Sequence, residues 1–178
     1  MKTSICFITG DQGVGKTTFV KKLAALLITS GYECGGFYAE GYWKNGIRDG
    51  FDIVEINGLK RERLCNTVSE VNDEQFHRFF FKQKGMELGY QILKTSEGKQ
   101  AIVFIDEVGG FELNGKGWAE AIFRLLHNPP SIMILAVRTS FEQAVTEKFE
   151  ADPINCWDVN QVSPELAFQQ LLSTLNKT

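Results

Sequence analysis

Residues 10–17 read Gly-Asp-Gln-Gly-Val-Gly-Lys-Thr, and they decide the fold of this 178-residue chain. They match the pattern G-x-x-x-x-G-K-[ST], in which a glycine-rich turn curls so that successive backbone N–H groups point at one anion. An apolar run, residues 4–9, precedes the pattern, and an amphipathic stretch, residues 16–29, follows it. A strand, a glycine-rich turn and a helix in this order distinguish a phosphate-binding loop from a chance match.

The pattern assigns chemistry to individual positions. Lys16 would reach the β- and γ-phosphates of a nucleoside triphosphate, and the Thr17 hydroxyl would bind Mg²⁺. Thr18 could donate to the α-phosphate, and the helix that begins here would aim its N-terminal N–H groups at the same anion. We expect the phosphate-binding residues to be Gly10, Asp11, Gln12, Gly13, Val14, Gly15, Lys16, Thr17 and Thr18.

A second apolar run, residues 101–105, ends in Asp106 and Glu107. The carboxyl end of a buried strand is where open α/β sheets bind ligands. Asp106 would hold Mg²⁺ directly or through water, although an aspartate here can also simply cap the turn after the strand. Glu107 would orient an attacking water or accept its proton. That arrangement suits hydrolysis, whereas a kinase must exclude water and hold an acceptor hydroxyl.

Two arginines are candidates for stabilising charge on the γ-phosphate. Arg138 follows the apolar run 131–137 and should therefore lie at the same edge of the sheet, and Arg48 lies in a predicted hairpin. Either could also be an ordinary solvated arginine. The arginine-rich lid of many P-loop kinases is not evident, although Arg61 and Arg63 leave it open. Trp43 could stack on a base or pack on the hairpin.

The remaining segments predict an α/β fold, with a largely parallel sheet flanked by helices. Asn45-Gly46 is a strong hairpin signal, so residues 35–56 should form a β-hairpin insertion after the first helix. The polar residues 59–73 predict a loop, and the aromatic residues 76–81 a short strand. Helices are expected at 86–94, 117–127, 141–150 and 164–175, and strands at 131–137 and 155–159, with Ser163 capping the last helix.

Composition narrows the function classes. Residues 1–178 are 43% hydrophobic and 23% charged, as in one ordinary globular domain. The net charge of −3 without a basic stripe argues against nucleic acid as a partner. No apolar run could cross a bilayer, and the start of the chain does not fit a signal peptide. The four cysteines show no metal-site or disulfide spacing, which favours reduced thiols in the cytoplasm. We expect Cys6 to be a core residue, and the isolated His77 and His127 to be surface or packed residues.

Four segments together resemble the P-loop nucleoside-triphosphatases of the thermophile and cancer-related type. They are GDQGVGKTT (10–18), GFYAEGYWKNGIRDGFDI (36–53), FIDEVGGFEL (104–113) and the strand and turn around 132–138. The resemblance covers nearly the whole chain. Its most specific parts are the Gly-Phe-Tyr hairpin ending in Arg48-x-Gly-Phe-Asp and the Asp-Glu-Val-Gly-x-x-Glu-Leu segment.

The resemblance implies a RecA-like fold and slow, Mg²⁺-dependent hydrolysis of several nucleoside triphosphates, ATP and GTP included, with little base preference. It gives Lys16, Thr17, Asp106 and Glu107 the family's phosphate, metal and water-activating roles, and Arg48 matches its hairpin arginine. Glu112 matches the second glutamate of the acidic segment.

The chain also departs from the family at two places. Gly41-Tyr42-Trp43 stands where many members carry Glu-Val-Arg, and Ser163-Pro164 stands where members often carry Asn-Arg. One arginine is thus missing, and any base or phosphate contact near residue 163 is in doubt.

Three hypotheses follow. The first is a Mg²⁺-dependent nucleoside-triphosphatase with broad base tolerance. The second is a small-molecule or nucleotide kinase, and the third is a nucleotide-gated module that binds a protein partner with little turnover.

Overall fold

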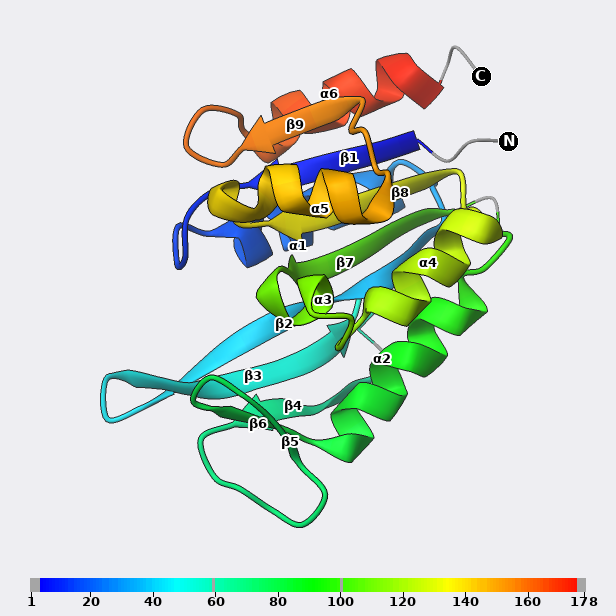
Figure 1. The fold of residues 1–178 in the computed structure, drawn as a ribbon. Helices are drawn as coiled ribbons and strands as arrows, with labels where there is room; N and C mark the ends of the chain where they lie inside the picture. Colours follow the sequence, from blue (N-terminus) through cyan, green and yellow to red (C-terminus); the bar gives the residue numbers. More distant parts are fainter. Residues whose placement is uncertain (1–3, 59, 100, 176–178) are drawn as a thin grey trace.

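Within the described residues, the apolar runs of the sequence form the parallel half of a nine-stranded mixed sheet (Figure 1). The computed structural model describes residues 4–58, 60–99 and 101–175, and the strand order is β5-β6-β4-β3-β2-β7-β8-β1-β9. Each neighbouring pair from β2 to β9 in this order is parallel. The parallel strands are β1 (Ser4–Thr9), β2 (Cys34–Lys44), β7 (Ile102–Val108), β8 (Ile132–Val137) and β9 (Asn155–Asp158).

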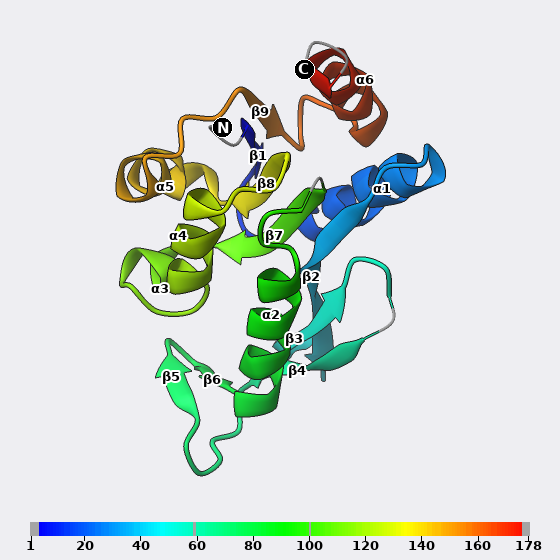
Figure 2. The same ribbon diagram turned by 90° about the vertical axis from the view of Figure 1, so that its right-hand side faces the viewer.

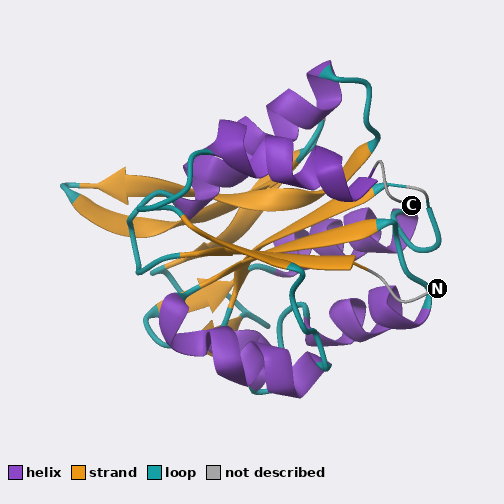
Figure 3. Ribbon diagram, turned by 90° about the horizontal axis from the view of Figure 1, so that it is seen from above, coloured by secondary structure: helices purple, strands orange, loops and turns teal. Residues whose placement is uncertain are grey.

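Helices cover both faces of this half, as the continuous apolar runs require. In β1, Ile5 and Phe7 face one hydrophobic core, whereas Cys6 and Ile8 face the other. The helices are α1 (Lys16–Thr29), α2 (Gln83–Thr95), α3 (Gly110–Leu113), α4 (Ala119–His127), α5 (Glu142–Phe149) and α6 (Pro164–Leu175), with a 3₁₀ turn, η1, at Thr139–Phe141. The first core includes residues of α2, α4 and α5, and the second includes residues of α1 and α6. Figure 2 shows these two groups of helices on opposite sides of the sheet, and Figure 3 shows helices on both of its faces.

These layers confirm the predicted α/β fold. Cys6 is fully buried, as expected, and the Ser163 hydroxyl caps α6 by accepting the N–H of Leu166 at 3.2 Å. No helix in the described part of the chain is long and apolar enough to span a bilayer.

An antiparallel half extends the sheet from the hairpin. Strand β2 turns at Asn45 (φ 51°) and Gly46 (φ 76°) into β3 (Ile47–Glu55), so the predicted hairpin is confirmed. Beyond it lie β4 (Arg61–Asn66), β6 (Phe79–Phe81) and β5 (Glu74–Phe76). The hairpin β2–β3 projects from the body of the molecule (Figure 1).

The predicted loop at 59–73 is wrong over residues 61–66, which form β4. The charges that suggested a solvated loop are paired across strands, because Arg61 and Arg63 both contact the Asp52 carboxylate of β3. Residue 59 lies outside the described residues. The single strand predicted at 76–81 is two strands joined by a turn at His77 (φ 52°), and α2 begins at Gln83 instead of residue 86.

Gly36 permits the close approach of β2 to β7. Its φ is +87°, and a Cβ atom there would overlap the carbonyl oxygen of Phe104. Gly31 has the same φ, +87°, but no atom lies within 4 Å of a Cβ placed on it. We therefore expect Gly36→Ala to lower the free energy of unfolding by about 3 kcal/mol, from backbone strain plus steric overlap. Gly31→Ala should cost about 1 kcal/mol, from backbone strain alone.

Urea unfolding of both variants measures this difference. Equal decreases in the free energy of unfolding would show that the overlap with Phe104 adds no cost and that the positive φ angle alone accounts for the destabilisation.

Candidate functional site

The glycine-rich loop after β1 is closed by its own lysine. Lys16 Nζ donates to the carbonyl oxygens of Gly10 at 2.9 Å and Asp11 at 2.8 Å. Gly13 (φ 81°) and Gly15 (φ 107°) provide left-handed backbone that a side chain would strain, and α1 begins directly after Gly15. Burial lowers the pKa of Lys16, while the nearby Glu107 and Asp106 carboxylates raise it. The loop therefore encloses a desolvated cation at the N-terminus of a helix, a strong anion site.

Asp106 joins this loop to the centre of the sheet. Its Oδ2 accepts the Thr17 hydroxyl at 2.7 Å and the N–H of Ala39 at 3.0 Å, and its Oδ1 accepts the N–H of Glu107 at 2.9 Å. The side chain is fully buried. Burial raises the pKa of Asp106 above its ordinary value, and repulsion from Glu107 adds to this, while the three hydrogen bonds oppose it. A hydroxyl and a carboxylate this close form an oxygen pair that suits Mg²⁺, whose other ligands are commonly water and substrate phosphates.

A bulge at the end of β7 places Glu107 beside Asp106. The register against β8 shifts between Ile105 and Val108, and Glu107 has a φ of 60°. In a regular strand, consecutive side chains point to opposite faces. Here Glu107 instead lines a pocket of about 240 Å³ together with Lys16 and Thr17. The bulge thus places two consecutive carboxylates at one site.

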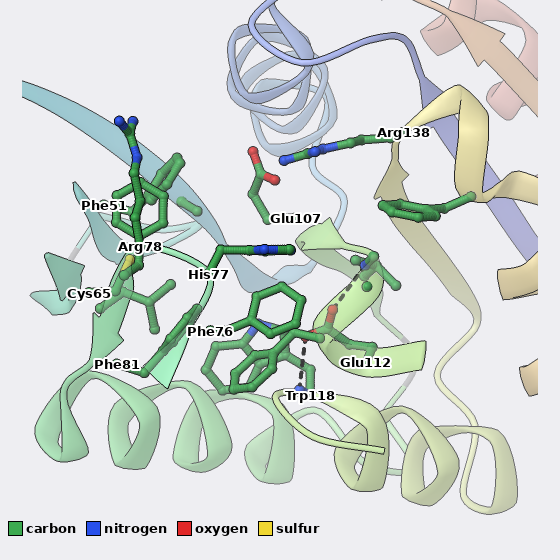
Figure 4. Close-up of a pocket in the computed structure, with 18 residues that line it drawn as sticks. Phe51, Cys65, Phe76, His77, Arg78, Phe81, Glu107, Glu112, Trp118 and Arg138 are labelled. Carbon is green, nitrogen blue, oxygen red and sulfur yellow. Dashed lines mark hydrogen bonds between the residues drawn. The ribbon is translucent and has the colours of Figure 1, made fainter. Parts of the chain in front are cut away.

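Both candidate arginines lie near this pocket. Arg48 lines it, with its guanidinium 4.8 Å from the Trp43 ring centroid and 5.1 Å from that of Phe51. Its Nε is buried and has no hydrogen-bond partner among the described residues. Arg138 follows β8 and extends toward Glu107 (Figure 4), and its charge contributes to lowering the pKa of Lys16. The structure therefore brings both cations to the phosphate end of the site.

Other candidate residues are committed to structural contacts. Trp43 is 61% exposed at the hairpin end and stacks with Arg48. The guanidinium of Arg61 binds Asp52 and Glu40, so it forms no free arginine lid. The Nδ1 of His127 lies 2.7 Å from the carbonyl oxygen of Phe123 on its own helix.

Glu112 organises the loop that follows β7. The side chain is buried and accepts the N–H of Gly109 at 2.9 Å and that of Trp118 at 3.2 Å. Burial raises the pKa of Glu112 to about 7, against the lowering effect of these two N–H groups. Both carboxylate oxygens are thus used in shaping residues 109–118.

A second pocket, of about 350 Å³, adjoins the phosphate pocket and was not predicted from the sequence. Figure 4 shows Glu107 and Arg138 at one end of it and aromatic rings at the other. The aromatic run 76–81 was its only sequence signal, because the other rings come from distant segments. These rings include Phe51, Phe76, Phe81, Phe111, Trp118 and Phe141.

Sequence comparison decides the family. The sequence profile of a protein family described as NTPase matches residues 5–172. This chain belongs to that NTPase family. The resemblance inferred from the sequence motifs is thereby confirmed.

Relatives of this NTPase-family chain occur in bacteria and mammals. The nucleoside-triphosphatase THEP1 of Thermotoga sp. (strain RQ2) is 25% identical over 169 residues, which cover 94% of this chain and 93% of the relative. The cancer-related nucleoside-triphosphatase homolog of Bos taurus is 30% identical over 140 residues, which cover 72% of each chain.

Solved structures of the family share the fold. The solution structure of a human cancer-related nucleoside triphosphatase aligns with a TM-score of 0.74 at 22% identity, covering 100% of this chain and 99% of that one. The crystal structure of THEP1 from Aquifex aeolicus aligns with a TM-score of 0.70 at 23% identity, covering 96% and 98%. The mixed sheet flanked by helices is thus the fold of this NTPase family.

The buried Glu112 predicts a pH dependence of stability. Its folded pKa of about 7 lies above the ordinary 4.5, so the native state holds this proton more tightly than the unfolded state. The stability contributed by the protonated form is complete below about pH 4.5 and is lost as the pH rises through 7. The loss amounts to about 3 kcal/mol.

The Glu112→Gln variant should lack this decrease in the free energy of unfolding between pH 4.5 and 7. Chemical unfolding from pH 4 to 8 is the measurement, and Glu87→Gln, on the exposed side of α2, is the control that should parallel the wild type. Identical slopes for the wild type and Glu112→Gln would contradict the assignment.

Proposed function

We propose that this protein is a Mg²⁺-dependent nucleoside-triphosphatase that removes the terminal phosphate of ATP, GTP and other nucleoside triphosphates. The 2.7 Å contact between the Thr17 hydroxyl and the buried Asp106, beside the curled loop, carries the proposal. A phosphate chain and a metal need this combination of N–H donors, a lysine, a hydroxyl and a carboxylate. The names of the relatives in Thermotoga and Bos taurus support the same activity.

Phosphate binding falls to the loop, residues 10–18. On binding, Lys16 exchanges the carbonyl oxygens of Gly10 and Asp11 for phosphate oxygens, which bear full charge and therefore bind it more strongly. Thr17 and Asp106 are the residues that would hold Mg²⁺. When bound, this ion neutralises charge on the phosphate oxygens.

Glu107 is the proposed water-activating group. It lines the pocket of Lys16 and Thr17, so its carboxylate can hold a water against the γ-phosphate and accept its proton as the new P–O bond forms. The bond from the γ-phosphorus to the β,γ-bridging oxygen breaks at the same time, and this oxygen leaves with the electron pair on the nucleoside diphosphate. Arg48 and Arg138 would stabilise the charge that develops on the transferred group. The guanidinium of Arg48 stacks on Trp43, and its buried Nε has no hydrogen-bond partner among the described residues, which supports a role in binding an anion.

The remaining features support a broad range of nucleoside triphosphates as substrates and a cytoplasmic location. The described groups of the site are suited to binding phosphates. Trp43 stacks with Arg48, and the Ser163 hydroxyl caps a helix, so neither side chain is placed to recognise a base. All described strands join one sheet, which supports one domain over residues 1–178. The four cysteines are free, which supports the cytoplasm as the location. Nucleic acid is not an expected partner, whereas a protein partner is compatible with this proposal.

Glu107→Gln tests the hydrolytic step. It keeps the shape of the side chain but cannot accept the proton, so kcat should fall about 10²–10⁴-fold while the Kd for Mg²⁺·ATP stays within about twofold. Phosphate release and calorimetric titration measure the two quantities. Lys16→Ala is the companion variant, and it should lose triphosphate affinity itself.

Normal turnover by Glu107→Gln would remove this residue from the mechanism. The absence of any magnesium-linked affinity for a triphosphate in the wild type would overturn the proposal itself.

Removing Arg48 or Arg138 should lower turnover, whereas removing a surface arginine should not. We expect Arg48→Ala and Arg138→Ala each to lower kcat by about 10²-fold or more, with a smaller change in KM, because they act on transition-state charge. Arg124→Ala is the control, since Arg124 pairs with Glu97 and Glu120 and lines neither cavity of the site. An arginine whose removal leaves kcat unchanged has no role in the transfer.

A further inference from the structure

The aromatic pocket beside Glu107 has the walls of a ligand site. Phe76 and Phe81 each lie against Phe111, with ring centroids 4.8 and 4.5 Å apart. Trp118 closes the deep end and is only 3% exposed. These rings come from the β5–β6 hairpin, α3 and the residue before α4. Their faces and edges form a cavity suited to a flat ring system, and a volume of about 350 Å³ fits one small molecule.

The pocket is continuous with the phosphate site. Ala39, Phe51 and Glu107 line both cavities. Figure 4 shows the Glu107 carboxylate at the end of the aromatic pocket nearest the glycine-rich loop, with Arg138 extending over it and His77 between it and Phe76. A molecule seated among the rings, with its polar end directed past His77, would reach Glu107, beside the cavity proposed to hold the γ-phosphate.

Hydrolysis does not need this cavity. Water, the nucleophile of the proposed reaction, is small and polar, and it gains nothing from a wall of phenylalanine rings. The ring walls and the carboxylate at the mouth instead match a molecule that is aromatic at one end and carries a hydroxyl at the other. Arg138, which extends over Glu107 at this end of the pocket, would stabilise negative charge as a phosphate ester forms.

We propose that this pocket binds a small aromatic alcohol and that the alcohol accepts the γ-phosphoryl group in place of water. The inference rests on the proposed nucleotide site and extends it from hydrolysis to transfer. The hydroxyl oxygen of the acceptor bonds to the γ-phosphorus as the bond from this phosphorus to the β,γ-bridging oxygen breaks. The bridging oxygen keeps that electron pair and leaves on the nucleoside diphosphate, and the hydroxyl proton passes to the Glu107 carboxylate.

The experiment follows γ-phosphate to its destination. The full chain is incubated with Mg²⁺·ATP and either 3-(hydroxymethyl)pyridine or 2-naphthalenemethanol, and ³¹P NMR separates phosphate esters from inorganic phosphate. The same rings without the hydroxyl, 3-methylpyridine and 2-methylnaphthalene, are the matched controls. Ligand-observed NMR without nucleotide measures seating of each probe in the pocket.

Phe76→Ala tests whether the ring wall holds the acceptor. We expect the ratio of ester to inorganic phosphate to fall about tenfold, because a stacking partner is lost. Phe123→Ala removes a ring of the same size from α4, where Phe123 contacts Phe149, and it should keep the wild-type ratio. Phe81→Leu is a second variant of the wall, and circular dichroism checks that each variant folds.

Each outcome decides the question. Ester formation that requires the hydroxyl and falls in Phe76→Ala supports the proposal. Normal phosphate release with no probe bound and no ester overturns the acceptor site but leaves hydrolysis intact. A probe that binds and alters phosphate release without becoming phosphorylated overturns the transfer step. A chain that neither binds nor hydrolyses ATP fails as a nucleoside-triphosphatase, and this inference fails with it.

Discussion

The buried carboxylate of Asp106 is the constraint on which the site depends. It accepts hydrogen bonds from Thr17 at the start of α1, from Ala39 in β2 and from Glu107 at the end of its own strand. Strand β8 separates β7 from β1, so the bond to Thr17 connects elements that do not pair in the sheet. A fully buried carboxylate is unfavourable without donors or a cation. Its three N–H and O–H donors fix the loop, the hairpin strand and the acidic turn relative to one another.

The same connection positions the groups that would act on the phosphate. Ala39 is held to Asp106, and β2 continues from there into the hairpin that returns with Arg48. On the other side, the bulge after Ile105 holds Glu107 in a left-handed conformation, which is unfavourable for most L-residues and which the surrounding structure must stabilise. Strained backbone of this kind gathers at functional sites, and here it places a carboxylate between two cavities.

Local patterns predicted much of the fold and the centre of the site. The glycine-rich loop, the hairpin turn at Asn45 and the buried parallel strands each depend on residues close in sequence. Strand β4 was missed because the charges of Arg61 and Arg63 are satisfied by Asp52 in another strand, a contact between distant residues that no local pattern records.

The aromatic pocket escaped prediction for the same reason as β4. Its walls meet only after the sheet brings the β5–β6 hairpin beside α3, since Phe76 and Phe111 are far apart in sequence but lie 4.8 Å apart by ring centroid. The backbone strain at Glu107 likewise arises from the register between β7 and β8 and is not visible in the Asp-Glu dipeptide. Tertiary register, not propensity, decides both features.

Because Glu107 lines both cavities, the proposed base could serve either nucleophile. A carboxylate accepts a proton from water or from an alcohol with little preference, so the base cannot by itself separate a hydrolase from a transferase. The nucleophile that reacts is then determined by whether an alcohol occupies the aromatic pocket. An aromatic alcohol held among rings has a high effective concentration at the γ-phosphate and excludes water from the space it fills. With the ring pocket empty, only solvent is available. In this proposal the shape of the neighbouring cavity selects between the two reactions, while the phosphate-binding residues are common to both.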